Sequence, residues 1–394
     1  MLARPSLFLL LLIGSSASAQ LPLDSKTEKT FSRLLENDSK GERLDCSVDT
    51  FTPFLDFSFR YEIGYVVRCP VGQFNGKKTA LGTILRVREG KGPMTTLGQL
   101  YSVPAIPAEL KDRVDLQHLR NEIEFSGVFA AGEGNYEVQL VVFDEHNRKH
   151  HKTWHAKAHP HGDEARANAA MEAGSVAPVS LPPWKGISSD GTGLKLTVLL
   201  DAAPVNPFSL KLRAWDRAFL LGALSSLLRQ TPVSSVRMIA FNLDQQLEVF
   251  HEDDFDHTGL YRLSAALNKL ELGTVSYRIL QQREGWQSLL GSLIRDEMLQ
   301  GRPSDAVVFL GPTIRVDKKI LPGSASKNDT HTPVFYFQYS PLPGREFPDT
   351  IQYLVSTYDG TTFHLHSPGD LARAIVKMQE QLERVNDLRA RATQ

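Results

Sequence analysis

Asp201 is the strongest candidate for a functional residue, judged by its carboxylate side chain and its position in the sequence. It ends the apolar run 194–201, which predicts a short strand buried on both faces, as in a parallel sheet. Pro204 and Pro207 then break the chain before a long helix. Because open α/β sheets bind ligands beyond the carboxyl ends of their strands, we expect the functional surface of this chain around Asp201.

The residues that follow Asp201 supply few oxygen atoms. A hard divalent cation needs several oxygen ligands, with carboxylates providing the charge. The sequence continues Ala202, Ala203, Pro204 and Val205, so this turn offers no second side-chain ligand. Asp201 is therefore interpreted either as the cap of a turn or helix, or as a contact on a metal-free binding surface.

Six histidines between His146 and His161 form a second candidate constellation. His151 and His155 share one side of a predicted strand, but at roughly 13 Å they are too far apart for one ion. His159 and His161 are closer, although the sequence around them supplies no supporting ligands. The pattern favours an exposed strand end over a metal site.

The acidic run 252–256 precedes a predicted helix, where negative charge is favourable. It lacks the alternating ligands and the glycine of a calcium loop. The chain also lacks a G-x-S-x-G elbow, a P-loop, an H-E-x-x-H motif and a dinucleotide fingerprint. A dispersed triad leaves no motif, so an enzyme stays an alternative, but we assign no catalytic residue and expect no cofactor and no metal.

The N-terminus has the features of a secretion signal. Arg4 precedes an apolar run at 7–13, and Ala17-Ser18-Ala19 fits a cleavage site. We expect residues 1–19 to be a signal peptide, with an uncleaved anchor as the alternative, and residues 20–43 to be a mobile lead-in. The mature chain is then exported, either periplasmic or secreted, with no transmembrane segment.

The charge balance limits the classes of partner to expect, and the cysteine content bears on the cellular compartment. The 44 basic and 45 acidic residues nearly balance, which gives no argument for nucleic acid or an anionic membrane as a partner. The chain has two cysteines, Cys46 and Cys69. In an oxidising compartment they are expected to form a disulfide, and two buried thiols are the alternative.

Two domains and a linker are predicted. Residues 44–158 contain short strands separated by turn signals and no clear helix, typical of an all-β immunoglobulin-like sandwich. Within it, alternation over 56–62 predicts a half-buried strand. Residues 159–193 are rich in Ala, Gly, Ser and Pro and form the expected linker, with Trp184 able to dock on a domain.

Residues 194–394 alternate strands and helices, which predicts a doubly wound α/β domain with a mostly parallel sheet. Helices are expected at 210–230, 258–272, 286–299, 347–357 and from Ser367-Pro368 onward; strands are expected at 194–201, 236–241, 246–250, 306–310, 334–339 and 361–366. The strands at 236–241 and 246–250 form a hairpin at the sheet edge. In the first helix, Leu212 and Trp215 belong to the apolar face.

This order resembles the von Willebrand factor A domain, a Rossmann-like fold. The stretches that carry the resemblance are 196–204, 236–243, 305–312 and 366–370, with 55–61 and 134–136 in the first domain. The two-domain layout is also similar to a family of exported acidobacterial proteins, a likeness that implies no activity.

The resemblance implies a metal-ion-dependent adhesion site that is degenerate here. Such domains use a D-x-S-x-S turn, a Thr between two helices and an Asp after the fourth strand. In this chain Ala203 and Val205 stand where the family has the two serines of the turn. The position of the family's Asp after the fourth strand falls near Leu310, so that Asp is absent, and Thr274 stands at the position of the family's Thr. The remaining polar residues define an expected partner-binding rim: Asp201, Asn206, Thr274, Ser276 and Thr313.

The sequence therefore predicts an exported, non-catalytic protein-binding or scaffolding module that uses an A-like domain without a conventional metal site. Its partner is expected to be a protein of the cell envelope or the exterior. A structural envelope protein and a hydrolase with dispersed catalytic residues are the alternatives.

Overall fold

The computed structural model contains three β-sheets and groups the chain into two compact units. It describes residues 21–22, 43–74, 77–105, 121–182, 184–187, 193–206, 208–273, 281, 285–294, 304–313, 332–340 and 349–392. The predicted signal peptide and most of the predicted lead-in lie outside these ranges. No helix of the described residues is long and apolar enough to span a bilayer.

The described residues of the first unit form β-strands and one short 3₁₀ turn, in keeping with the predicted all-β region, and the unit includes Glu62–Ala158 and Ala173–Ser180. One sheet has five strands in the order β1 (Leu21–Pro22), β6 (Thr95–Val103), β5 (Thr79–Glu89), β8 (Gly134–Asp144) and β9 (Lys149–Ala158). The other sheet has the order β10 (Val176–Pro178), β7 (Glu122–Ala131), β4 (Tyr61–Pro70) and β2 (Ser47–Thr50). The short strand β3 (Phe54–Leu55) also pairs with β4, and the 3₁₀ turn η1 (Val71–Phe74) follows β4 along the chain. The strand pairs in both sheets are antiparallel.

Alternating side chains of the two sheets pack against each other. Tyr65 of β4 meets Trp154 of β9 edge to face at 6.3 Å. Its hydroxyl also bonds to Thr83 of β5 at 3.2 Å. Cys46 and Cys69 form the predicted disulfide within this unit, joining the segment before β2 to the end of β4. The bond therefore fastens an edge strand to the sheet interior.

The second unit is built on a six-stranded sheet in the order β13-β12-β11-β14-β15-β16. Its strands are β11 (Leu194–Asp201), β12 (Val233–Asn242), β13 (Leu247–Glu252), β14 (Ala306–Pro312), β15 (Val334–Tyr339) and β16 (Thr361–Leu365). The pairs are parallel except β12 with β13, which form the predicted edge hairpin. Because β11 and β14 are central and both run parallel, their carboxyl ends lie side by side.

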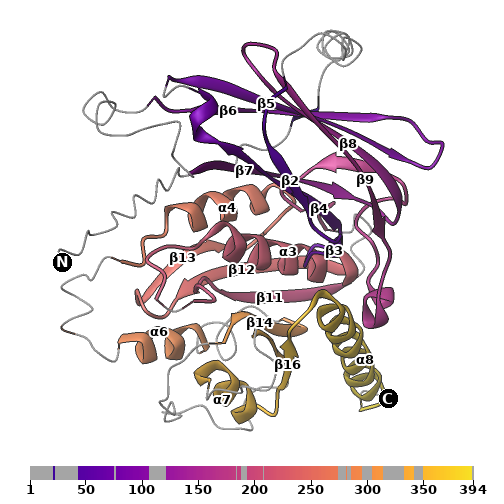
Figure 1. Cartoon of the computed structure of the whole chain (residues 1–394). Coiled ribbons are helices and arrows are strands. Elements are labelled where there is room, and N and C mark those ends of the chain that lie inside the picture. The colour runs from indigo at the N-terminus through magenta and orange to yellow at the C-terminus, as the bar shows by residue number, and fades with distance from the viewer. Residues whose placement is uncertain are drawn as a thin grey trace, which may run out of the picture. The chain divides into compact units, whose positions relative to one another are not determined.

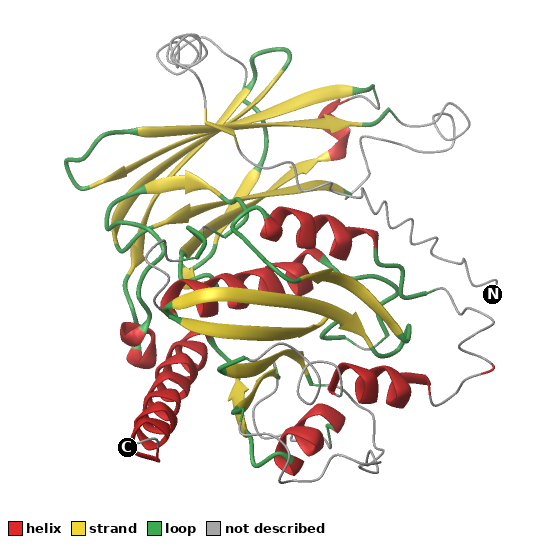
Figure 2. Ribbon diagram, turned by 180° about the vertical axis from the view of Figure 1, so that it is seen from behind, coloured by secondary structure: helices red, strands yellow, loops and turns green. Residues whose placement is uncertain are grey.

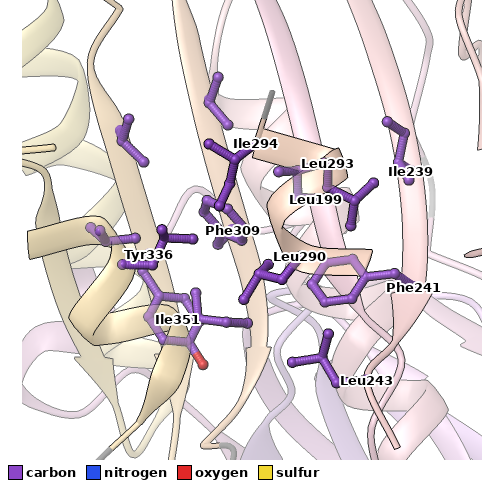
Figure 3. Close-up of a cluster of buried hydrophobic side chains, with 14 of the residues drawn as sticks. Leu199, Ile239, Phe241, Leu243, Leu290, Leu293, Ile294, Phe309, Tyr336 and Ile351 are labelled. Carbon is purple, nitrogen blue, oxygen red and sulfur yellow. The ribbon is translucent and has the colours of Figure 1, made fainter. Parts of the chain in front are cut away.

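Helices cover both faces of this sheet, as Figures 1 and 2 show. The helices are α3 (Ala214–Gln230), α4 (Gly259–Lys269), α6 (Gly285–Ile294), α7 (Thr350–Thr357) and α8 (Pro368–Ala392). The side chains of α6 and α7 pack with Leu199, Phe309 and Tyr336 in one buried apolar cluster (Figure 3). On the opposite face, α3 contacts both α4 and α8.

Residues 55–61, which we call the turn 55–61, belong to the second unit. Positions 56–60 form a turn between β3 and β4, so the predicted strand at 56–62 is wrong at these positions. The reason is Asp56, whose Oδ1 accepts the backbone N–H groups of Ser58 and Arg60, both at 2.9 Å. These bonds satisfy the backbone locally, in place of a strand ladder. Phe57 at the tip then packs on Phe219 of α3 at 4.9 Å between ring centroids.

The expected linker 159–193 contributes to both units. His159–Glu172 belongs to the second unit and contains the 3₁₀ turn η2 (Gly162–Arg166), whose Asp163 pairs with Arg373 of α8 at 2.6 Å. Ala173–Ser180 belongs to the first unit and contains β10. Trp184 stacks on Phe255 in the second unit at 5.7 Å. The Ala- and Gly-rich composition therefore does not mark a free linker.

Candidate functional site

The candidate site is the carboxyl edge of the six-stranded sheet. Leu200 of β11 pairs with Leu310 of β14, so Asp201 lies beside Gly311. A Cβ atom built on Gly311 would lie 2.7 Å from the Cβ of Asp201, which is closer than any real contact. The missing side chain at position 311 is therefore what allows Asp201 to occupy this place.

Asp201 is buried below the surface of this edge, only 1% exposed. Among the described residues, neither of its carboxyl oxygens has a hydrogen-bond partner. Burial raises the pKa of Asp201 well above its ordinary value, and the neighbouring carboxylates of Asp349 and Asp244 raise it further. The surroundings therefore favour the uncharged acid.

Asp349 is a second buried carboxylate at this edge, and its oxygens are in use. Its Oδ1 accepts the N–H groups of Ile351 at 2.8 Å and Gln352 at 3.1 Å, capping α7. Its Oδ2 accepts the Gln338 Nε2 at 2.8 Å and the Tyr336 hydroxyl at 3.1 Å. A carboxylate bound by four donors has little capacity left for a metal.

The sequence contained a signal for Asp349 that we did not use. An Asp that directly follows a proline and precedes a helix is a strong N-cap pattern. Gln338 is likewise a polar residue inside the apolar run 334–339, and it is 3% exposed in the structure. A buried amide needs a partner, so a nearby carboxylate could have been inferred.

Asn242 ties the turn that follows β12 to the turn that follows β11. It ends β12 and is fully buried. Its Nδ2 donates to the carbonyl of Ala202 at 2.8 Å, and its Oδ1 accepts the Gln245 N–H at 2.8 Å. The turn after Asp201 is therefore held by an amide at the site where ligating hydroxyls were expected.

The structure brings three of the predicted rim residues to this edge, in different environments. Asn206 is exposed, and its Oδ1 accepts the Phe208 N–H at 3.1 Å. Thr313 is half-buried and donates to the Tyr339 carbonyl at 3.2 Å. Asp201 lies beneath them, so it does not offer a surface contact. Thr274 and Ser276 lie outside the described residues.

Large apolar side chains are exposed where the chain leaves this edge. Phe208 is 84% exposed, Leu210 73% and Trp215 53%. Leu212 and Trp215 were both predicted on the apolar face of a helix beginning at residue 210. The helix α3 instead begins at Ala214: Leu212, which precedes it, is buried, whereas Trp215 in its first turn is exposed. We call residues 208–217 the apolar-basic segment, because Lys211, Arg213 and Arg217 alternate with these side chains.

The other two candidate clusters, the histidines between His146 and His161 and the acidic run 252–256, are surface or capping groups. The described residues contain no group of three or more His, Cys, Asp or Glu placed to hold a metal. Within the acidic run, Arg262 forms ion pairs with both Glu252 and Asp256. The pKa of Asp256 is lowered to about 2, and the hydrogen bond from the Thr258 side chain is the largest cause. His151 lines a shallow hollow of about 190 Å³ on the first unit, with Arg86 and Gln139 among its neighbours.

Comparisons with known proteins leave the family open. No protein-family model and no curated protein matches the chain. An ApaA protein from Bordetella pertussis aligns at 13% identity over 31% of this chain and 100% of its own, with a TM-score of 0.17. A glycosyl hydrolase family 2 member from Bacteroides cellulosilyticus (12% identity) and a β-glucuronidase from Bacteroides uniformis (8%) align over 80% of this chain but only 36% and 38% of their own lengths, both with a TM-score of 0.19. At such scores these likenesses carry no conclusion about fold or activity.

Proposed function

We propose that this chain is an exported, non-catalytic protein-binding or scaffolding module whose second unit is a von Willebrand factor A-like domain without a conventional metal site. The strand order, the single antiparallel hairpin at the edge and the helices on both faces support the A-like assignment. The first unit is then an immunoglobulin-like sandwich, for which two packed antiparallel sheets give support.

The donor set supports recognition without a cation. Ala203, Val205 and Leu310 place apolar side chains where oxygen ligands are needed. Asp201 is buried and favoured in its uncharged form, and the oxygens of Asp349 already accept four hydrogen bonds. A cation that used Asp349 as a ligand would have to displace these hydrogen bonds.

The observation that carries the proposal is the exposure of Phe208, Leu210 and Trp215 at the edge where open α/β sheets bind ligands. Exposed aromatic and aliphatic side chains that lie together are typical of protein interaction sites.

A photo-cross-linking amino acid at Asn206 tests the proposal. In the native cell envelope we expect it to capture a discrete protein, while the same group at Leu100 of the first unit, an equally accessible position, captures none. Substituting Phe208→Ser together with Leu210→Ser should abolish the capture. Equal capture at both positions, or none at either, would favour the structural envelope protein.

Calorimetry with Mg²⁺, Mn²⁺ and Ca²⁺ tests the cation-free part separately. We expect no saturable binding up to millimolar concentration. Saturable binding that disappears in Asp201→Asn would show that a cation belongs to the site.

A further inference from the structure

The apolar-basic segment exposes one sign of charge. Lys211 and Arg213 are exposed, and Arg217 is half-buried, donating to the Leu212 carbonyl at 2.6 Å. The single carboxylate, Asp216, is 3% exposed, and it accepts the N–H groups of Val205 at 3.0 Å and Arg213 at 2.7 Å. Its charge is therefore used inside the fold, and the charges presented to a partner are positive.

The backbone of this segment is fixed. The Leu210 carbonyl accepts the N–H groups of Leu272 at 3.1 Å and Gly273 at 3.2 Å, and the backbones of Lys211 and Glu271 form an isolated antiparallel β-bridge. Trp215 lies near enough to the Tyr339 hydroxyl to affect its pKa, and Tyr339 stacks on Phe219 at 4.2 Å. The exposed indole is thus next to a buried aromatic pair. A surface that is already ordered loses little entropy on binding.

We propose that the apolar-basic segment binds an acidic peptide segment of the partner protein that carries apolar side chains. Phe208, Leu210 and Trp215 would contact the apolar side chains, and Lys211 and Arg213 would pair with the carboxylates. This inference rests on the proposed function and specifies the chemistry of the partner.

An exposed aromatic side chain next to a buried aromatic pair, on a backbone fixed by hydrogen bonds, favours a protein partner over a lipid surface. Rigid aromatic anchors with few free torsions are the residues that dominate protein interfaces. Charge complementarity at the rim then selects the partner and speeds association. An anionic lipid surface would offer the same negative charge, so it is the outcome that the experiment must separate.

A random peptide library displayed on phage and selected on the full chain provides the probe. We expect enriched sequences to combine Asp or Glu with Phe, Leu or Trp. All four tryptophans are described, and Trp184 and Trp286 are buried while Trp154 is half-buried, so Trp215 is the one most accessible to quenchers. Binding of a selected peptide should shift the emission to the blue and protect Trp215 from acrylamide.

Matched variants show which side chains of the apolar-basic segment bind the peptide. The pair Phe208→Ser and Leu210→Ser should weaken peptide binding about tenfold or more, because it removes buried apolar area. The pair Lys211→Glu and Arg213→Glu should weaken it about tenfold and remove its salt dependence. Leu100→Ser is the control, since Leu100 is 70% exposed in the other unit. It should leave the affinity unchanged.

Three outcomes would overturn the inference. One is enrichment of peptides without acidic residues. Another is a fluorescence shift with phosphatidylglycerol vesicles and none with selected peptides. The third is capture from Asn206 that persists unchanged in the charge-reversed variant, in which case the proposed function stands and only the partner chemistry fails.

Discussion

Asp201 lies where open α/β sheets present their ligands, yet it is enclosed by Gly311 and by the turn that Asn242 holds. A buried carboxyl without donors destabilises its charged form, because nothing replaces the lost hydration. The neighbouring carboxylate of Asp349 acts in the same direction. The residue is therefore interpreted as a neutral part of the core, below the surface that would bind a partner.

Replacing Asp201→Asn should make the protein less sensitive to pH. The folded-state pKa of Asp201 is raised, so the folded state holds a proton that the unfolded state releases above its ordinary pKa of about 3.9. Wild-type stability should therefore fall as the pH rises above that value toward the folded pKa. The variant should gain relative stability over this range, by up to about 1.4 kcal/mol per pH unit.

Urea unfolding at a series of pH values from 4 to 8 checks this expectation. Glu380→Gln, an exposed carboxylate on α8, is the control and should leave the pH profile of the wild type unchanged. A constant difference between Asp201→Asn and the wild type would show that Asp201 is charged when folded.

Asp349 has the opposite role, because its charge is matched by donors. Asp349→Ala removes the cap of α7 and leaves the donors of Tyr336 and Gln338 unpaired, so we expect a loss of about 2–4 kcal/mol in the free energy of unfolding. Asp349→Asn keeps a capping oxygen and should lose less. Thermal unfolding measured beside the wild type checks the order, and an alanine variant as stable as wild type would contradict the network.

The element that differs most from its predicted form is the turn 55–61, which packs on α3. Gly222 of α3 permits the approach, since a Cβ atom there would lie 3.1 Å from the Ser58 nitrogen. Ser226 then donates to the Phe57 carbonyl at 2.8 Å. The guanidinium of Arg229 lies over the Phe59 ring at 5.9 Å. One face of α3 is thus specific for this turn.

Two glycines in helices give a matched test of that contact. Gly222→Ala should destabilise the protein by about 1–3 kcal/mol, because the added methyl meets the backbone of the turn. Gly291→Ala on α6 meets no atom within 4 Å and should be neutral or stabilising by up to about 1 kcal/mol. Denaturant unfolding of both variants provides the comparison, and equal effects would argue against the packing of the turn on α3.

The chain as a whole does not divide at a single boundary. The second unit takes Leu55–Tyr61 and His159–Glu172 from parts of the sequence outside the predicted domain 194–394. Phe57 supplies ring contacts to Phe219 and Tyr339, and Asp163 supplies an ion pair to Arg373. The predicted boundary therefore omits part of this unit's own core.

A chain that begins at Leu194 should be less stable than the second unit in the full protein. Loss of Phe57 leaves a cavity beside Phe219 and Tyr339, a change that costs about 3–5 kcal/mol in cores. Hydrogen exchange of α3 in the short chain and in the full chain measures the difference directly. Equal protection in the two would show that the earlier segments are dispensable.

The sequence by itself determined the strand-rich first half, the order of strands and helices after residue 194, the edge hairpin and the disulfide. These depend on apolar periodicity, turn residues and cysteine pairing, which are local or nearly local signals. The sequence also showed that no residue with a hydroxyl group follows Asp201 in its turn. The partner site without a cation is a proposal that starts from that observation, and the A-like assignment is likewise a proposal.

Only the tertiary structure decided which side chains are buried at the carboxyl edge and which are exposed there. Asp201 is enclosed by Gly311 and by the turn that Asn242 of another strand holds, whereas Trp215, predicted on an apolar face, is exposed in the first turn of α3. The turn 55–61 belongs to a unit whose other segments begin only at His159. Such contacts join residues far apart along the chain, and no local pattern of the sequence records them.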